Sequence, residues 1–374
     1  MSQVASMEDH TAEGIQWKQL WSLAALYGSI VIGWIAYHNY QPKLLVKFEF
    51  TDFTFLLTVA QGLILTITPP IAGKLGDRFR FKEGHRLPII SSGISFAAMV
   101  FMAVAFTLLS NPGEVFKWIL PLLIVLWLVA MSIFTSPALS TMELFTPIDK
   151  LPRAMAILTI VGSLIYALEP VIVDLIDFIG APATFVAGGV AVFLSGYALK
   201  RNSMGLFAQN TTRPRAAIML DTQKSNYLFI WVLGICLGFA TTLLLKIFPD
   251  MLQNTLGNLW QIEGKWIVVL VLVVSAAFSI PASNMVNKYG MSSVFWYSVV
   301  LVLLSILGIV FFSQPWAIVA TLLLFALTFT TLSVSSLPLA IKSANYYEKV
   351  FCVGIFFSGV ELPEGIIESI LSYQ

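Results

Sequence analysis

The sequence predicts an all-α membrane protein that crosses the bilayer many times. Its residues are 58% hydrophobic and only 11% charged, whereas soluble globular domains carry about 25% charged residues. The apolar residues gather into runs of the roughly 20 residues that a transmembrane helix needs. These runs are about twice as long as transmembrane strands and do not alternate in polarity, which argues against a β-barrel.

About eleven apolar segments follow one another along the chain. We predict that each is a helix, because only helices satisfy their own backbone polar groups within lipid. The segments cover residues 18–40, 53–75, 88–110, 116–141, 153–176, 182–200, 226–248, 264–286, 292–313, 316–340 and 350–371. Most of the connections between them are short.

The longest connection divides the chain into two parts. It is polar and separates six apolar segments from five. We therefore predict an N-terminal six-helix bundle (1–200), a cytoplasmic linker (201–225) and a C-terminal five-helix bundle (226–374). Since transporters built from two repeats normally have an even number of helices, we expect a twelfth helix to be missing or truncated.

Lysine and arginine predict the orientation. A cytoplasmic N-terminus puts most of these residues into inner loops, as the positive-inside rule requires. The outer loops would then keep only Lys43, Lys47, Lys117, Lys246 and Lys265. No removable signal peptide is evident before Trp17, so we predict a multi-pass protein of the cell (inner) membrane, surrounded by lipid.

Polar and aromatic side chains in the first two segments predict a solute site. Trp34, Tyr37 and His38 lie in the first segment, and Gln61 lies in the second. Together they offer hydrogen-bond donors and acceptors beside aromatic faces, which suits a hydroxylated solute. For the residues of the first segment, an aromatic belt at the outer interface is the alternative interpretation.

The turn between the second and third segments carries a specific motif. Gly73, Asp77, Arg78, Gly84 and Pro88 match the pattern G-x3-D-R-x5-G-R-R-R-P, except that the three arginines become His-Arg-Leu and only Arg86 is kept.

This motif resembles the loop between helices 2 and 3 of the major facilitator superfamily. It is most similar to the branch of glycoside–pentoside–hexuronide:cation symporters and sucrose transporters. The stretches 136–147 and 335–340 resemble further regions of that superfamily. Two features depart from the branch: the first segment has no acidic residue, and the second-half copy of the motif, at 281–290, lacks the Asp-Arg pair.

The resemblance implies a major-facilitator-type fold of two helical bundles and a gating role for the charged turn. We expect Asp77, near the start of the third helix, to act with Arg78 and Arg86 in holding the cytoplasmic side closed. Glu143 and Arg153 could form a second lock. The alternative is that these charges only set topology and solubility.

Four acidic residues fall inside predicted helices. Glu169 precedes a proline in the fifth segment, and Glu361, Glu364 and Glu368 share one face of the last segment. Because a carboxylate within the bilayer is costly unless protonated, paired or hydrated, we predict that Glu361, Glu169 and Glu364 couple transport to protons or another cation. We interpret Glu368 as a hydrated residue of the outer interface.

The sequence therefore predicts a secondary active transporter of a small polar organic solute, with a sugar or glycoside as the expected class. A transporter-like membrane subunit without transport activity and an exporter of an amphipathic compound are the alternatives. The chain could act as a monomer or within a membrane complex. A net charge of +1 argues against nucleic-acid binding. The sequence has no catalytic triad, metal cluster or phosphate loop, so we expect neither an enzyme nor a cofactor.

Overall fold

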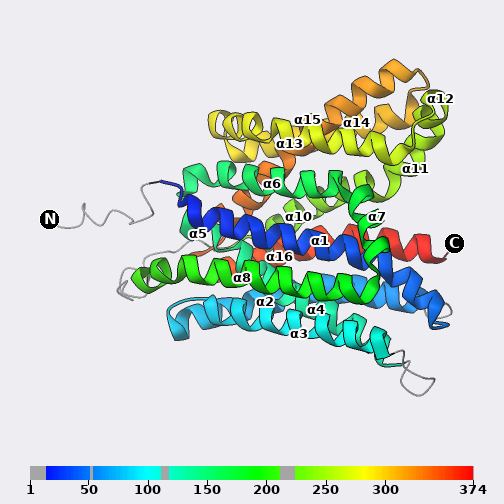
Figure 1. Ribbon diagram of the computed structural model, residues 1–374. Coiled ribbons are helices and arrows are strands. Elements are labelled where there is room, and N and C mark those ends of the chain that lie inside the picture. Colours follow the sequence, from blue (N-terminus) through cyan, green and yellow to red (C-terminus); the bar gives the residue numbers. More distant parts are fainter. Residues whose placement is uncertain (1–13, 51–53, 111–117, 211–223, 374) are drawn as a thin grey trace.

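The protein is a bundle of long helices that lie side by side (Figure 1). The computed structural model describes residues 14–50, 54–110, 118–210 and 224–373, and every regular element within them is helical. We call the end of the bundle where α1 begins the near end and the end where α16 finishes the far end; they lie at the left and right of Figure 1.

The helices have these bounds. In the first half they are α1 (Trp17–Lys47), α2 (Thr54–Glu83), α3 (Leu87–Ser110), α4 (Ile119–Leu139), α5 (Met142–Phe145), α6 (Leu151–Ala167), α7 (Glu169–Ile179) and α8 (Ala181–Asn210). In the second half they are α10 (Tyr227–Thr242), α11 (Phe248–Leu252), α12 (Asn258–Trp260), α13 (Gly264–Tyr289), α14 (Met291–Phe311), α15 (Pro315–Lys342) and α16 (Lys349–Tyr373).

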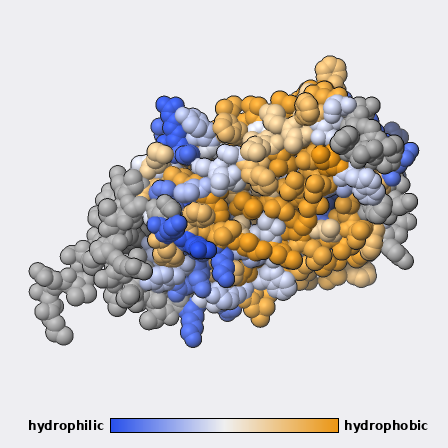
Figure 2. All heavy atoms as spheres, turned by 90° about the horizontal axis from the view of Figure 1, so that it is seen from below, coloured by the Kyte–Doolittle hydropathy of each residue, from blue (hydrophilic) through white to orange (hydrophobic). Residues whose placement is uncertain are grey.

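The expected number of membrane spans is confirmed. Ten helical stretches in the described residues are long and apolar enough to cross a membrane, and the bent pair α6–α7 makes up to eleven. The helix α8 continues past residue 200 into the range predicted as a linker, of which residues 211–223 lie outside the described part. The surface has a broad apolar band between more polar ends, as a bilayer requires (Figure 2).

The helices that carry the predicted coupling acids each contain a proline, and only one of the two helices is broken there. The axis turns by 58° between α6 and α7, where Pro170 follows Glu169 at the start of α7. Proline lacks the N–H that would continue the helical ladder, so a bend at this place is expected. Pro363 lies within α16, which runs without interruption from Lys349 to Tyr373.

The seventh predicted segment is longer than expected. The helical stretch runs from Tyr227 to Trp260, because two π-helical segments, Leu243–Ile247 and Gln253–Gly257, connect α10, α11 and α12. Lys246 lies in the first of them, inside the span. Its prediction as an outer-loop residue is wrong.

The helices α2 and α16 form the most extensive contact between the two halves of the chain. Glycines let the two backbones approach closely. A Cβ on Gly365 would lie 2.7 Å from the Cα of Gly62, and a Cβ on Gly73 would lie 2.7 Å from the Cα of Phe351. Small residues favour helix association in membranes, where packing rather than the hydrophobic effect drives contact.

A methyl group in this seam should destabilise the fold. We expect Gly73→Ala to cost about 1–3 kcal/mol, because overpacking forces backbone shifts. Gly205→Ala is the matched control, since no atom lies within 4 Å of the position its Cβ would take. Thermal melting of both variants in detergent tests this. Equal melting temperatures would contradict a tight seam.

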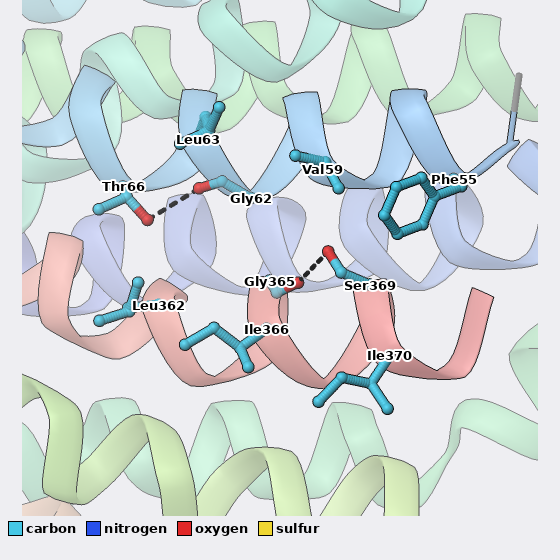
Figure 3. A pocket seen from close by; sticks show the side chains of 10 residues that line it. All are labelled: Phe55, Val59, Gly62, Leu63, Thr66, Leu362, Gly365, Ile366, Ser369 and Ile370. Atoms are coloured by element: carbon cyan, nitrogen blue, oxygen red, sulfur yellow. Dashed lines mark hydrogen bonds between the residues drawn. The ribbon is translucent and has the colours of Figure 1, made fainter. Parts of the chain in front are cut away.

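An apolar groove of about 520 Å³ lies beside the glycine contact. Figure 3 shows α2 on one side and α16 on the other, with Gly62 and Gly365 between them. The remaining lining residues are Phe55, Val59, Leu63, Thr66, Leu362, Ile366, Ser369 and Ile370. Thr66 and Ser369 both donate hydrogen bonds to carbonyls of their own helices, so the groove presents little polar surface.

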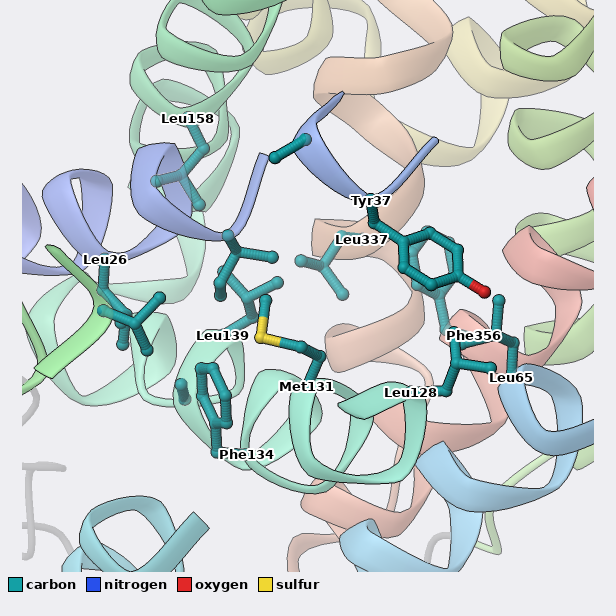
Figure 4. Packing of buried hydrophobic residues seen from close by; sticks show 14 of the residues in the cluster. Leu26, Tyr37, Leu65, Leu128, Met131, Phe134, Leu139, Leu158, Leu337 and Phe356 are labelled. Atoms are coloured by element: carbon teal, nitrogen blue, oxygen red, sulfur yellow. The ribbon is translucent and has the colours of Figure 1, made fainter. Parts of the chain in front are cut away.

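The interior of the bundle is a continuous apolar core. Figure 4 shows buried side chains from several helices meeting, among them Tyr37 of α1, Met131 of α4 and Phe356 of α16. The ring of Tyr37 stacks on Trp127 with centroids 4.6 Å apart. This packing fixes the part of α1 that carries Trp34, Tyr37 and His38.

Candidate functional site

A cluster of charged residues at the near end connects the two halves of the chain. We call it the near-end cluster, and its members are Asp77, Arg80, Arg86, Glu143 and Lys349. Asp77, in α2, is buried, and its carboxylate accepts hydrogen bonds from the N–H groups of Val350 at 3.2 Å and Phe351 at 2.8 Å. These are free donors of the first turn of α16, where negative charge is favourable. We expected Asp77 to lie near the N-terminus of the third helix. The structure corrects this expectation, because the Asp77 carboxylate caps the N-terminus of α16 instead.

Glu143 is the second centre of the near-end cluster. Its carboxylate lies 2.6 Å from Arg86, 2.8 Å from Lys349 and 3.9 Å from Arg80. Arg86 is 1% exposed and also donates to the hydroxyl of Ser140 at 2.6 Å. Burial lowers the pKa of the Arg86 guanidinium, and the charge of Glu143 opposes that shift.

Two residues predicted for this cluster do not belong to it. Arg153 is exposed and forms no ion pair with Glu143, so the predicted Glu143–Arg153 lock is wrong. Arg78 is also exposed, and no described residue forms an ion pair or hydrogen bond with its side chain. The cluster instead includes Arg80, which the sequence reasoning did not select; it donates to the carbonyl of Tyr346 at 3.1 Å.

A second cluster of polar groups lies inside the bundle, nearer the far end. We call it the acid–lysine cluster, and its members are His38, Gln61, Lys246, Glu364 and Glu368. The Nζ of Lys246 lies 2.6 Å from Oε1 of Glu368 and 3.5 Å from Oε1 of Glu364. Lys246 lies in the π-helical segment Leu243–Ile247, and such segments are frequent at functional sites.

The acid–lysine cluster also joins the two halves. Glu368 Oε2 accepts a hydrogen bond of 3.2 Å from Gln61, whose own carbonyl oxygen accepts one of 2.9 Å from Tyr37. The imidazole of His38 lies 3.4 Å from Glu364 and 3.5 Å from Glu368. Residues of α1 and α2 thus contact Lys246 and residues of α16 at one place.

Glu368 is therefore not the freely hydrated residue that the sequence suggested. Its side chain is 17% exposed and has contacts with three other members of the cluster. Asp177, by contrast, is well exposed at the end of α7 and pairs with Lys43 at 2.7 Å, as an interfacial acid would.

Glu361 and Glu169 lie beside the acid–lysine cluster, but neither forms a hydrogen bond or an ion pair with its members. No described residue forms a hydrogen bond or an ion pair with Glu361, which lies near the hydroxyl group of Tyr27. Glu169, at the bend, interacts electrostatically with Lys246. Both acids also act on Tyr166, so the fifth and last predicted segments bring their acids to a common region.

Comparison with known proteins gives the family. The family model of the Major Facilitator Superfamily matches residues 21–362. This chain belongs to the Major Facilitator Superfamily. No curated protein gives a significant match. The family consists of transporters that bind small-molecule solutes.

Solved structures of this superfamily share the fold at low identity. The human organic anion transporter MFSD10 (TETRAN) is 12% identical, with a TM-score of 0.63, covering 96% of this chain and 93% of that one. The proton:xylose symporter XylE bound to 6-bromo-6-deoxy-D-glucose is also 12% identical, with a TM-score of 0.60, covering 93% of this chain and 87% of that one.

The predicted solute residues of this major facilitator protein do lie together. The rings of Trp34 and Tyr37 meet edge-on with centroids 5.7 Å apart, and the imidazole of His38 lies tilted to Trp34 at 5.9 Å. The hydroxyl group of Tyr37 donates a hydrogen bond to Gln61. Lys246 is the functional candidate that sequence reasoning missed. It lies within the segment predicted at 226–248, so a search for basic residues inside spans would have found it.

The near-end cluster can be tested with a cysteine already present. Cys352 is fully buried, one residue after Phe351. In a Cys236→Ser background, we expect Asp77→Asn to increase the alkylation rate of Cys352 by N-ethylmaleimide roughly tenfold. The reason is that hydrogen bonds to a charged group contribute about 1.5–3 kcal/mol to closure. Arg78→Gln is the matched control and should leave the rate unchanged. Equal rates in the two variants would exclude a closing role for Asp77.

Proposed function

We propose that this chain is a secondary active transporter that moves a small polar organic solute and couples it to protons or another cation. One observation carries the proposal: the carboxylates of α16 contact groups of both halves within the bundle. Glu368 binds Lys246 from the second half and Gln61 from the first. A change in charge at Glu368 therefore alters contacts on both sides of the interface.

Coupling follows from this arrangement. In alternating access one half of the protein moves against the other around a central site. A proton or cation that binds Glu364 or Glu368 competes with Lys246, His38 and Gln61 for the same oxygens. Binding would then weaken the contacts that join the halves at this level and favour their movement.

Glu361 and Glu169 are the candidates for loading the coupling ion. Glu361 has no bonding partner among the described residues, and an unpaired carboxylate within the bilayer costs several kcal/mol unless it is protonated or hydrated. It is thus available to accept a proton. Glu169, at the bend of α6–α7, would act as its counterpart from the first half.

The solute would bind beside Trp34, Tyr37, His38 and Gln61. Stacked rings and amide or imidazole groups suit a hydroxylated molecule, and the sequence resemblance favours a sugar or glycoside. Similarity to a proton:xylose symporter agrees with this choice. We further propose that the N-terminus is cytoplasmic, that the protein lies in the cell membrane, and that the near-end cluster closes its cytoplasmic side between the bundles 1–200 and 226–374.

Uptake into proteoliposomes tests the proposal. With an imposed pH gradient, we expect the wild type to accumulate at least one sugar from a panel of pentoses, hexoses and glucosides, and Glu361→Gln to lose the response to the gradient. Flux that ignores both the gradient and the substitution would refute coupling. Absence of any flux, with copurification of a fixed partner, would favour a membrane subunit without transport activity.

An exporter of amphipathic compounds is the second candidate, and the groove between α2 and α16 favours it. The groove is apolar and lies beside Gly62 and Gly365, the next residues after Gln61 and Glu364. In the same proteoliposomes, efflux of an amphipathic dye that requires Glu368, without sugar uptake, would select this alternative.

A further inference from the structure

Three side chains of the acid–lysine cluster have the chemistry and spacing of a metal site. His38, Glu364 and Glu368 each offer one ligand atom, and these atoms all lie within 4.8 Å of one another. The Nε2 of His38 lies 3.4 Å from Glu364 and its Nδ1 lies 3.5 Å from Glu368, and only one of these nitrogens would serve as a ligand. Ligands at about 2.0–2.1 Å from a tetrahedral zinc ion lie roughly 3.3 Å apart, and imidazole and carboxylate are ordinary zinc ligands.

A cation already lies among these three groups. The ammonium nitrogen of Lys246 is 2.6 Å from Glu368 Oε1, 3.3 Å from His38 Nδ1 and 3.5 Å from Glu364 Oε1. One nitrogen thus contacts all three potential ligands. It comes from a different helix, and its side chain is only 25% exposed.

We propose that His38, Glu364 and Glu368 form a cation site and that the Lys246 ammonium is its tethered occupant. The lysine takes the place that a mobile inorganic cation would otherwise fill. The charges also fit a cation site. The two carboxylates carry two negative charges, of which the ammonium neutralises one and a divalent ion would neutralise both.

This inference deepens the proposed function and rests on it in one respect. If the protein is a cation-coupled transporter, the ion that acts at Glu364 and Glu368 is the proton, because an inorganic ion has no room at this site while Lys246 fills it. Removal of the lysine should therefore open the site to a divalent ion that prefers imidazole and carboxylate ligands.

Zinc binding to purified protein tests the inference without any transport measurement. We expect Lys246→Leu to bind one Zn²⁺ per chain in isothermal titration, at least about tenfold more tightly than any background site of the wild type. Zn²⁺ should also raise the melting temperature of this variant more than that of the wild type. Adding His38→Ala to Lys246→Leu should remove the new binding.

The matched control is Lys265→Leu. Lys265 is an exposed lysine that also pairs with an acid, Glu263, but it has no histidine or second carboxylate in contact among the described residues. Should Lys246→Leu not be recovered as a folded protein, Lys246→Gln serves for the same titration, because it keeps a donor for Glu368 without the charge.

Three results would overturn the inference. These are no gain of Zn²⁺ affinity in a folded Lys246 variant, the same gain in Lys265→Leu, and a gain that persists after His38→Ala. A failure of the proposed function is distinguishable, since it would abolish gradient-driven uptake and leave the zinc titrations as expected.

Discussion

Glu368→Gln should abolish concentrative transport while leaving the protein folded. A gradient of one pH unit can support roughly tenfold accumulation of a solute that moves with one proton, because tenfold corresponds to about 1.4 kcal/mol. The amide keeps the size of the side chain but cannot ionise, so its contacts no longer change with the coupling ion. We expect the accumulation ratio of the variant to fall to about one.

The measurement is uptake of the transported solute into proteoliposomes with an imposed pH gradient, compared with solute exchange at equal pH. Exchange should persist in Glu368→Gln, because the solute residues Trp34 and Tyr37 are unchanged. Asp177→Asn is the matched control. Asp177 is also ion-paired but lies exposed at the far end, and surface pairs contribute about 0–1 kcal/mol. Normal accumulation by Glu368→Gln would show that this carboxylate is not part of coupling.

Lys246→Leu should be the most destabilising substitution of the acid–lysine cluster. It leaves Glu364 and Glu368 facing each other without a cation, and removal of one partner from a buried ion pair costs about 3–5 kcal/mol. Lys265→Leu should cost less than about 1 kcal/mol, because that pair is solvent-exposed. Thermal melting in detergent compares the two variants.

A second substitution distinguishes lost charge balance from lost packing. If the cost of Lys246→Leu comes from unpaired carboxylates, adding Glu368→Gln should restore part of the stability, and the two effects should not add. Additive losses would mean that the lysine stabilises the fold through its side-chain packing and not through its charge.

The helices were predictable because hydropathy is a local property of the sequence. Each apolar run satisfies its own backbone, so its existence does not depend on its neighbours. The bend beside Glu169 was predictable for the same reason, since Pro170 removes a hydrogen bond within its own helix. The identical reasoning fails for Pro363, because α16 continues through it from Lys349 to Tyr373.

The partners of the charged residues were not predictable. Asp77 was placed at a helix N-terminus, which is correct in kind, but the helix is α16, and Phe351 lies 274 residues further along the chain. Lys246 was counted among the outer-loop residues because it lies at the end of the segment predicted at 226–248. Only the tertiary structure reveals that the π-helical segments carry the span onward and that acids of α16 balance the lysine.

We propose that the carboxylates of α16 couple solute movement to an ion. Proton movement that is driven by a solute gradient alone tests this proposal most directly. A transported sugar is added outside proteoliposomes that enclose a pH-sensitive dye, with no pH gradient at the start. We expect acidification of the interior by the wild type and none by Glu361→Gln or Glu368→Gln. Sugar entry without a pH change in the wild type, or with the same change in the variants, would contradict coupling through these residues.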